Sequence, residues 1–204
     1  MLERAHRHLA VALVLGATAL VGACAGGEDA NEDTTALGSA PGALDTAGGA
    51  AAGEMSDAQI FGFTSLVNNA EVEAGQLAQE KGSHARVKEY ARMMVTDHSN
   101  NERQAGELAQ QLNVNPSEPA DDEMKRQHDE LMNRLRDASG AAFDSLYITG
   151  MVQEHQETLQ RLNAALNATQ EAQVQQFLNE TRQKVQQHLE RAQQIQGELA
   201  GGGR

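Results

Sequence analysis

Three histidines follow similar short patterns in this chain of 204 residues: MVTDH ends at His98, MVQEH ends at His155 and KVQQH ends at His188. A neutral imidazole is a good ligand for Zn, Cu and Fe ions, but it also serves as a hydrogen-bonded residue of protein cores. Three imidazoles that meet at one place would form a metal site, whereas imidazoles at separate places would be packing residues. The elements that carry the three histidines therefore decide between these interpretations.

Residues 56–199 are helical in pattern, because Ala, Gln, Glu and Leu dominate and apolar side chains recur every three or four positions. Ser56 with Gln59 has the pattern of a capping box at the start of the first helix. Glycine and proline breaks then predict four long helices and one shorter helix, over residues 56–82, 84–115, 119–138, 141–168 and 171–199.

The shorter helix lies between the second and third long helices and predicts the topology. If the shorter helix returns the chain to the end of the bundle at which the second long helix begins, the third long helix runs parallel to the second. The expected fold is therefore all-α, a ferritin-like four-helix bundle with one crossover helix. An up-down bundle of five helices is the alternative, since periodicity alone does not separate the two.

In the crossover topology the three histidines lie at one level. Each is 15 to 17 residues from the start of its predicted helix, roughly 23–26 Å at about 1.5 Å per residue, and each falls in an apolar stripe. Glu71 approaches from the first helix at a similar height. The candidate site is thus mononuclear, with one transition metal ion (Zn, Cu or Fe) held by His98, His155 and His188 and with Glu71 as a possible fourth ligand.

The neighbours of these histidines have simpler interpretations. Met94 and Met151 each lie one turn before a histidine, where core filling is favoured over ligation of Cu(I). Asp97 and Glu154 directly precede their histidines, and we expect surface charge rather than a role in orienting an imidazole. His128, on the short helix, has no companion motif.

The N-terminal part resembles a bacterial lipoprotein signal. Residues 1–23 combine Arg4 and Arg7 with an apolar stretch too short for a permanent membrane anchor. Residues 21–24, VGAC, resemble a lipobox, which predicts lipidation of Cys24, the only cysteine. By resemblance to Gram-negative lipoproteins, Ala25 implies the outer membrane, with the protein facing the periplasm. The membrane is then a partner through the anchor at Cys24.

Two further segments are expected to lack a core. Residues 24–55 form a flexible linker, because they are rich in Gly, Ala, Thr and Asp and poor in large apolar side chains. Residues 200–204 form a disordered tail. The folded domain is therefore expected to span residues 56–199.

Charge and motifs exclude several functions. The chain has 16 basic and 29 acidic residues, a net charge of −13, so nucleic acid is not an expected partner. The sequence contains no GxSxG, no glycine-rich phosphate loop and no HExxH. No catalytic residue is predicted, an enzyme is not the favoured interpretation, and no protein partner is indicated.

Four segments resemble a bacterial family labelled as outer membrane proteins of unknown function and grouped with ferritin-like bundles: NNAEVEAGQLA, VKEYARMMVTDH, FDSLYITGMVQEH and VQQFL with QQHL. The resemblance covers almost all of residues 56–199 and implies the bundle fold and an envelope location, without an activity. Di-iron ferritins carry Glu-x-x-His on two helices, whereas Val95, Val152 and Val185 stand at the glutamate positions here. A ferroxidase is therefore disfavoured.

The interpretation favoured first is an envelope-anchored, ferritin-like lipoprotein that acts as a structural or stress-related interaction module, with histidines that hydrogen-bond inside the core. The alternative is a metal-binding bundle with a histidine-rich site. A ferroxidase-type enzyme ranks third.

Overall fold

A computed structural model describes residues 55–117 and 122–201, which form five α-helices within one unit, Gly48–Arg204. The helices are α1 (Asp57–Lys81), α2 (Ala85–Gln111), α3 (Asp122–Asp137), α4 (Gly140–Ala168) and α5 (Ala172–Gly201). The two described ranges contain no strand, which confirms the prediction of an all-α protein. None of these helices combines the length and the apolar character that a membrane crossing needs.

The helix ends follow local capping chemistry. The capping box is formed, because the Gln59 backbone N–H donates to Ser56 Oγ at 3.3 Å and the Ser56 backbone N–H donates to Gln59 Oε1 at 3.0 Å. Helix α2 ends at Gln111, before the predicted end at 115. Asn113 has a positive φ of 55°, and the backbone N–H groups of Asn113 and Val114 close the helix on two carbonyl groups of its last turn. At the other end of the chain, α5 extends to Gly201, two residues past its predicted end.

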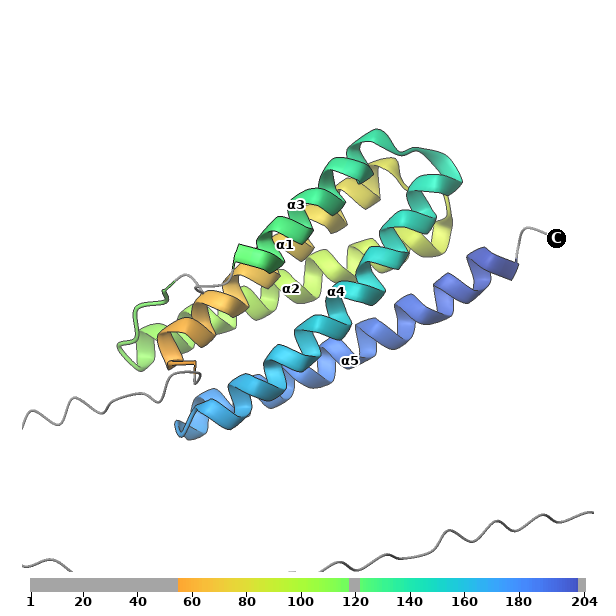
Figure 1. Ribbon diagram of the computed structural model, residues 1–204. Coiled ribbons are helices and arrows are strands. Elements are labelled where there is room, and N and C mark those ends of the chain that lie inside the picture. Colours follow the sequence, from red (N-terminus) through yellow and green to blue (C-terminus); the bar gives the residue numbers. More distant parts are fainter. Residues whose placement is uncertain (1–54, 118–121, 202–204) are drawn as a thin grey trace, which may run out of the picture. The chain divides into compact units, whose positions relative to one another are not determined.

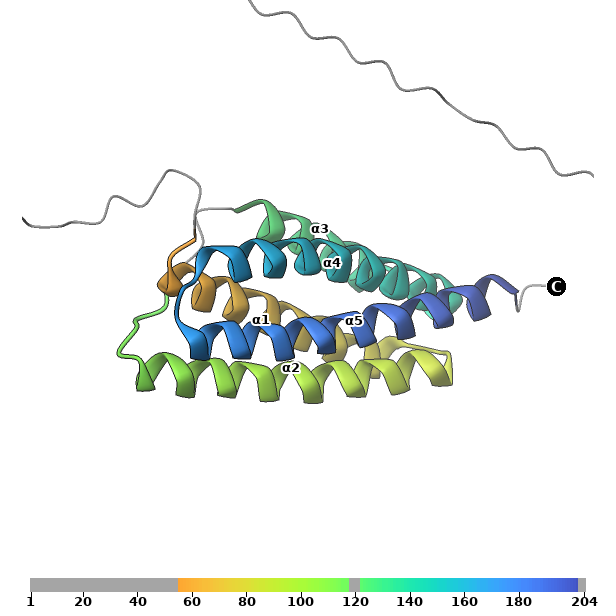
Figure 2. The same ribbon diagram turned by 90° about the horizontal axis from the view of Figure 1, so that it is seen from below.

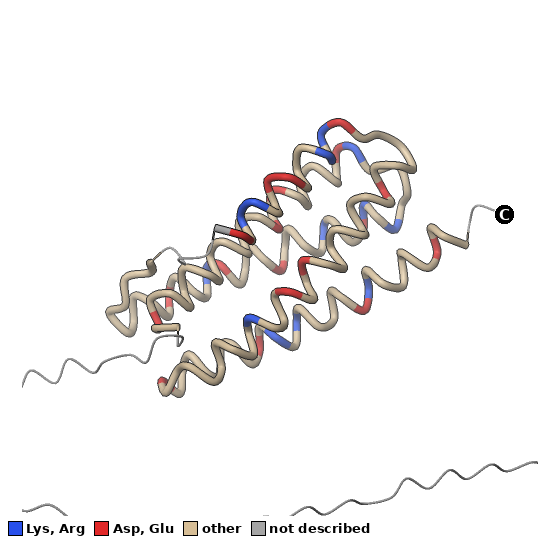
Figure 3. Tube along the Cα trace, viewed as in Figure 1, with Lys and Arg blue, Asp and Glu red and all other residues tan. Residues whose placement is uncertain are grey.

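Four helices surround the core, and α3 lies outside them. Helices α1 and α2 form one antiparallel pair and α4 and α5 form another; α2 packs on α5 and α1 packs on α4, while α3 contacts α1 and α4. Figures 1 and 2 show α3 returning the chain between α2 and α4, which run in the same direction. Acidic and basic residues alternate along α3 (Figure 3), as expected for a helix with a solvated face.

Gly75 allows α1 and α2 to approach closely. A Cβ atom at this position would lie 2.9 Å from Val95 Cγ2 and 3.1 Å from the Ala91 carbonyl oxygen. Glycine is therefore required by the packing rather than by backbone conformation.

A polar layer separates two apolar clusters. Along α2, α4 and α5, buried apolar residues of one cluster precede each histidine and those of the other cluster follow it. On α1 the same boundary is occupied by Asn68 and Glu71, which are 2% and 3% exposed. The buried polar residues of this layer are Asn68, Glu71, His98, His155 and His188. The sequence thus places these five buried polar side chains at one height along four helices.

Asp144 connects the start of α4 to the start of α2. Its carboxylate accepts hydrogen bonds from the backbone N–H groups of Ser83 (2.9 Å) and His84 (2.8 Å) and from Ser83 Oγ. Tyr147, three residues further along α4, does not contribute a hydrogen bond to this carboxylate, since its hydroxyl has no hydrogen-bond partner within the described residues. The carboxylate instead satisfies the free N–H groups of the neighbouring helix.

Asp144→Ala is therefore expected to lower the free energy of unfolding by about 2 kcal/mol, because it leaves the backbone N–H groups of Ser83 and His84 without their charged acceptor. Urea denaturation followed by circular dichroism measures this change. Asp129→Ala is the matched control, since Asp129 pairs with Lys125 on an exposed surface and its loss should cost less than about 1 kcal/mol. Equal losses in the two variants would contradict the capping role.

Several predicted features lie outside the described residues. They are the signal peptide over residues 1–23, the lipidation of Cys24, the linker except for its last residue, Met55, and residues 202–204 of the predicted tail.

Candidate metal centre

His98 on α2, His155 on α4 and His188 on α5 meet inside the bundle. Their ring centroids are 5.9 Å apart for His98 and His155, 5.3 Å for His98 and His188, and 5.5 Å for His155 and His188. One nitrogen from each ring lies within 4.8 Å of the others, and all three residues are buried. The predicted convergence is confirmed, and these three residues are called the histidine triad below.

The tautomer of His98 follows from its neighbour Asn68. The Asn68 amide nitrogen donates to Asn101 Oδ1 at 3.0 Å and to Glu102 Oε2 at 3.2 Å, so Asn68 Oδ1 remains as the acceptor. His98 Nδ1 lies 2.9 Å from that oxygen and must be the donor. The lone pair of His98 is therefore on Nε2, which has no hydrogen-bond partner within the described residues.

The same reasoning applies to His188 with the roles of its two nitrogens exchanged. His188 Nε2 donates to Asp97 Oδ2 at 2.9 Å, because an ionised carboxylate only accepts. The lone pair is then on Nδ1, which is buried and makes no hydrogen bond to a described residue. In metal-ligating histidines one ring nitrogen donates a hydrogen bond and the other keeps its lone pair for the ion. His98 and His188 both have this arrangement.

His155 lies beside Glu71 rather than in a hydrogen bond with it. His155 Nδ1 is 3.4 Å from Glu71 Oε1 without hydrogen-bond geometry, and neither nitrogen of His155 has a hydrogen-bond partner among the described side chains. Glu71 was predicted as a possible fourth ligand. The structure places its carboxylate 3.4 Å from His155 Nδ1, whereas the converging group consists of the three imidazoles. Its direct ligation of a metal stays a prediction.

Burial keeps the triad neutral. Desolvation, with the other triad members as a second cause, holds the pKa of His98 well below its usual value. Desolvation and His188 lower the pKa of His155 to about 3. Desolvation also lowers the pKa of His188, although Asp97 opposes this effect. The raised pKa of Glu71 has burial as its main cause and the charge of Glu154 as its second. Neutral imidazoles are the form that binds metal ions.

The geometry fits an ion after small side-chain movements. Nitrogens about 2.0–2.1 Å from a tetrahedral ion lie roughly 3.4 Å from one another, so the observed spacing of up to 4.8 Å must contract slightly. The contraction required between any two of these nitrogens is at most about 1.4 Å. The triad can therefore supply three nitrogen ligands to one ion.

Sequence reasoning missed two residues that orient the triad, Asn68 and Asp97. Asp97 was assigned to surface charge, but it reaches across to His188. Glu154, the equivalent residue of the second pentapeptide, similarly contacts His128 Nδ1 on α3 at 3.1 Å. The acid that directly precedes both His98 and His155 was the available signal. Asn68 had no such signal in the sequence.

Asp97→Ala is expected to weaken metal binding about 10- to 100-fold, because it removes the acceptor that fixes the tautomer of His188. Competition with a chelator of known affinity measures the effect. Glu190→Ala removes the same charge from an exposed position on α5 and should leave affinity unchanged. Equal affinities of the two variants would show that Asp97 does not position His188.

Comparisons with known proteins agree with this architecture. The family described as a domain of unknown function, DUF4142, matches residues 43–195. None of the curated proteins matches the chain. Among solved structures, a secreted protein with a DUF305 domain from Streptomyces coelicolor is similar at 12% identity and a TM-score of 0.61, covering 71% of this chain and 93% of its own.

Two structures of CopM, one in a Cu(I)-bound form and one in a Cu(II)-bound form, are also similar. Their identities are 15% and 14%, with TM-scores of 0.57 and 0.59. The matches cover 70% and 71% of this chain and 96% and 98% of CopM. At these identities the likeness shows a shared helical fold.

Proposed function

Since the chain belongs to the DUF4142 family, a domain of unknown function, we propose its role from the site itself: the bundle binds one copper ion between His98, His155 and His188. The observation that carries this proposal is a set of buried, converging nitrogens without hydrogen bonds. Four of the six ring nitrogens of the triad have no partner within the described residues. A buried polar group without a partner costs about 1–3 kcal/mol, and an ion removes this cost.

This observation favours metal binding over the first sequence interpretation, a core that histidines stabilise through hydrogen bonds. Hydrogen bonds between side chains account for one nitrogen of His98 and one of His188 and for neither nitrogen of His155. The oriented lone pairs are better explained by a ligand at the centre of the triad.

Copper is the proposed ion for two reasons. Imidazole is a good ligand for copper, and copper exceeds zinc in affinity for most nitrogen sites. CopM, which shares the fold, is known in Cu(I)- and Cu(II)-bound forms. The proposal concerns binding rather than catalysis, because the carboxylates of a ferroxidase are replaced by Val95, Val152 and Val185.

We further propose that the bundle is of the ferritin-like type with one crossover helix and acts in the cell envelope. The parallel course of α2 and α4 supports the first point. The lipobox resemblance at Cys24 supports an outer membrane lipoprotein, and the similar Streptomyces protein is described as secreted. Labelling with a palmitate analogue, compared with Cys24→Ser, tests the anchor.

Copper binding is tested with the purified chain carrying no affinity tag. Titration with Cu(I) and with Cu(II) against competing chelators, followed by elemental analysis, should give one copper per chain. Zn(II) in a parallel titration should bind more weakly than Cu(II). A chain that retains no stoichiometric metal after loading would refute the proposal.

A further inference from the structure

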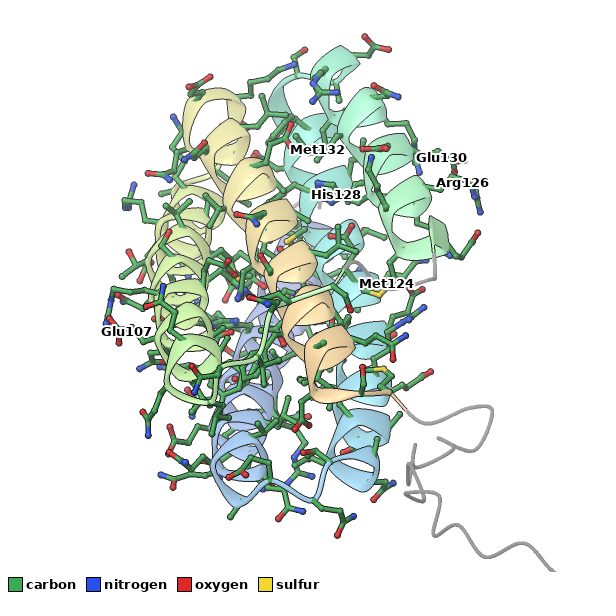
Figure 4. The ribbon with its side chains drawn as sticks, turned by 90° about the vertical axis from the view of Figure 1, so that its left-hand side faces the viewer. Glu107, Met124, Arg126, His128, Glu130 and Met132 are labelled. Carbon is green, nitrogen blue, oxygen red and sulfur yellow. The ribbon has the colours of Figure 1, made fainter. Side chains whose placement is uncertain are left out.

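A small cavity lies beside the triad, between α1, α3 and α4. Its volume is about 50 Å³, enough for an ion or a few water molecules. The polar or soft side chains that line it include Glu71, Met124, His128 and Glu154. Figure 4 shows His128 and Met132 directed toward the bundle from α3, whereas Arg126 and Glu130 point away from it.

The acidic and imidazole groups form a series from the surface to the triad. Side-chain exposure falls from 18% at Glu154 to 11% at His128, 3% at Glu71 and 1% at His155. Two contacts support the series, 3.1 Å between His128 Nδ1 and Glu154 Oε1 and 3.4 Å between Glu71 Oε1 and His155 Nδ1. The two pairs therefore lie between solvent and one ligand of the triad, and Glu71, His128 and Glu154 line the same cavity.

The three residues of this series that line the cavity each have a buried atom without a hydrogen bond to any described residue. These atoms are Glu71 Oε2, His128 Nε2 and Glu154 Oε2. The contact with Glu154 occupies His128 Nδ1, so Nε2 is the nitrogen left for a ligand. Met124 precedes His128 by four residues, on the same face of α3, and adds a thioether, a soft ligand for Cu(I). The cavity thus offers several unused metal-binding atoms.

Glu154 also borders an outer hollow of about 210 Å³ between α3 and α4. A larger hollow of about 420 Å³ lies between α4 and α5, but neither a triad residue nor Glu71 lines it. The small cavity therefore lies between this outer hollow and the triad, and Glu154 lines both the cavity and the outer hollow.

We infer that this cavity is the route by which copper reaches the triad, with His128 and Glu154 as transient ligands and Glu71 as the carboxylate next to His155. The Glu154 carboxylate and the His128 imidazole can replace part of the hydration of a cation on this path. Glu71, His128 and Glu154 are too far apart to bind one ion together, since the triad is the one converging set of possible ligands within the described residues. They fit sequential contacts rather than a second permanent site. This inference depends on the proposed copper binding.

The route makes a kinetic prediction that a structural role does not make. His128→Leu, Glu154→Gln and Ala70→Leu, which fills the cavity from α1, should each slow copper uptake and copper release at least tenfold. Because a route lowers both rates together, the equilibrium dissociation constant should change less than about threefold. Stopped-flow measurement of copper uptake, and of copper release to a chelator, gives both rates.

Glu107→Gln is the matched control, because it removes a charge from an exposed position on α2, away from the cavity and the outer hollow (Figure 4), and should change neither rate. Unchanged rates in all three cavity variants would overturn the route. Faster release with weaker equilibrium binding would also overturn it, because that result makes these residues ligands of the final site. A wild-type chain that binds no copper would instead refute the proposed function, so the two failures are distinguishable.

Discussion

His155→Leu is expected to abolish stoichiometric copper binding and, at the same time, to stabilise the metal-free protein. The substitution removes one of three nitrogen ligands, so affinity should fall at least about 100-fold. It also replaces two buried nitrogens that have no partner within the described residues by an apolar side chain of similar size. The free energy of unfolding without metal should rise by about 1–3 kcal/mol.

Chelator competition and urea denaturation measure the two effects in the same preparation. His84→Ala is the control, since His84 lies at the exposed start of α2, where its Nδ1 accepts from the Arg86 backbone N–H. Its copper stoichiometry should equal that of the wild type. Lower stability of His155→Leu, with unchanged copper binding, would establish His155 as a packing residue.

The metal-free protein is expected to lose stability steeply as the pH falls from 6.5 to 3. An unfolded histidine takes up a proton near pH 6.5, whereas the pKa of buried His155 is about 3. The unfolded state therefore binds more protons in this range, so acid favours unfolding. At about 1.4 kcal/mol per pKa unit, His155 alone corresponds to roughly 5 kcal/mol. His98 and His188 act in the same direction because their pKa values are also lowered. Glu71 acts in the opposite direction because its pKa is raised, but it is one group against three.

Urea midpoints between pH 8 and pH 4 measure this dependence. The control is His155→Leu, which should show a shallower loss because one titrating group has been removed. Stability that is independent of pH between 6.5 and 4 would contradict the burial of neutral imidazoles.

Periodicity and spacing were sufficient to predict the level at which the triad forms. His98, His155 and His188 each lie in an apolar stripe at a similar distance from a recognisable helix start, and a helix has a fixed rise per residue. The convergence therefore followed from helix bounds and chain direction. Small errors at helix ends, such as the early end of α2 at Gln111, did not alter it.

The hydrogen-bond partners were not predictable in the same way. Whether Asp97 faces solvent or His188 depends on the rotation of α2 against α5, and spacing along one helix does not determine that angle. Asn68 presents its carbonyl oxygen to His98 because its amide nitrogen donates to Asn101 and Glu102. His128 had no companion in its own segment, since its partner Glu154 comes from another helix. These details arise from tertiary packing.

X-ray absorption at the copper edge of the loaded, tag-free protein tests the central claim most directly. Three nitrogen ligands at about 2.0 Å, with the outer-shell scattering of imidazole rings, are the predicted result. A spectrum of oxygen ligands alone, as surface carboxylates would give, would contradict copper binding by the histidine triad.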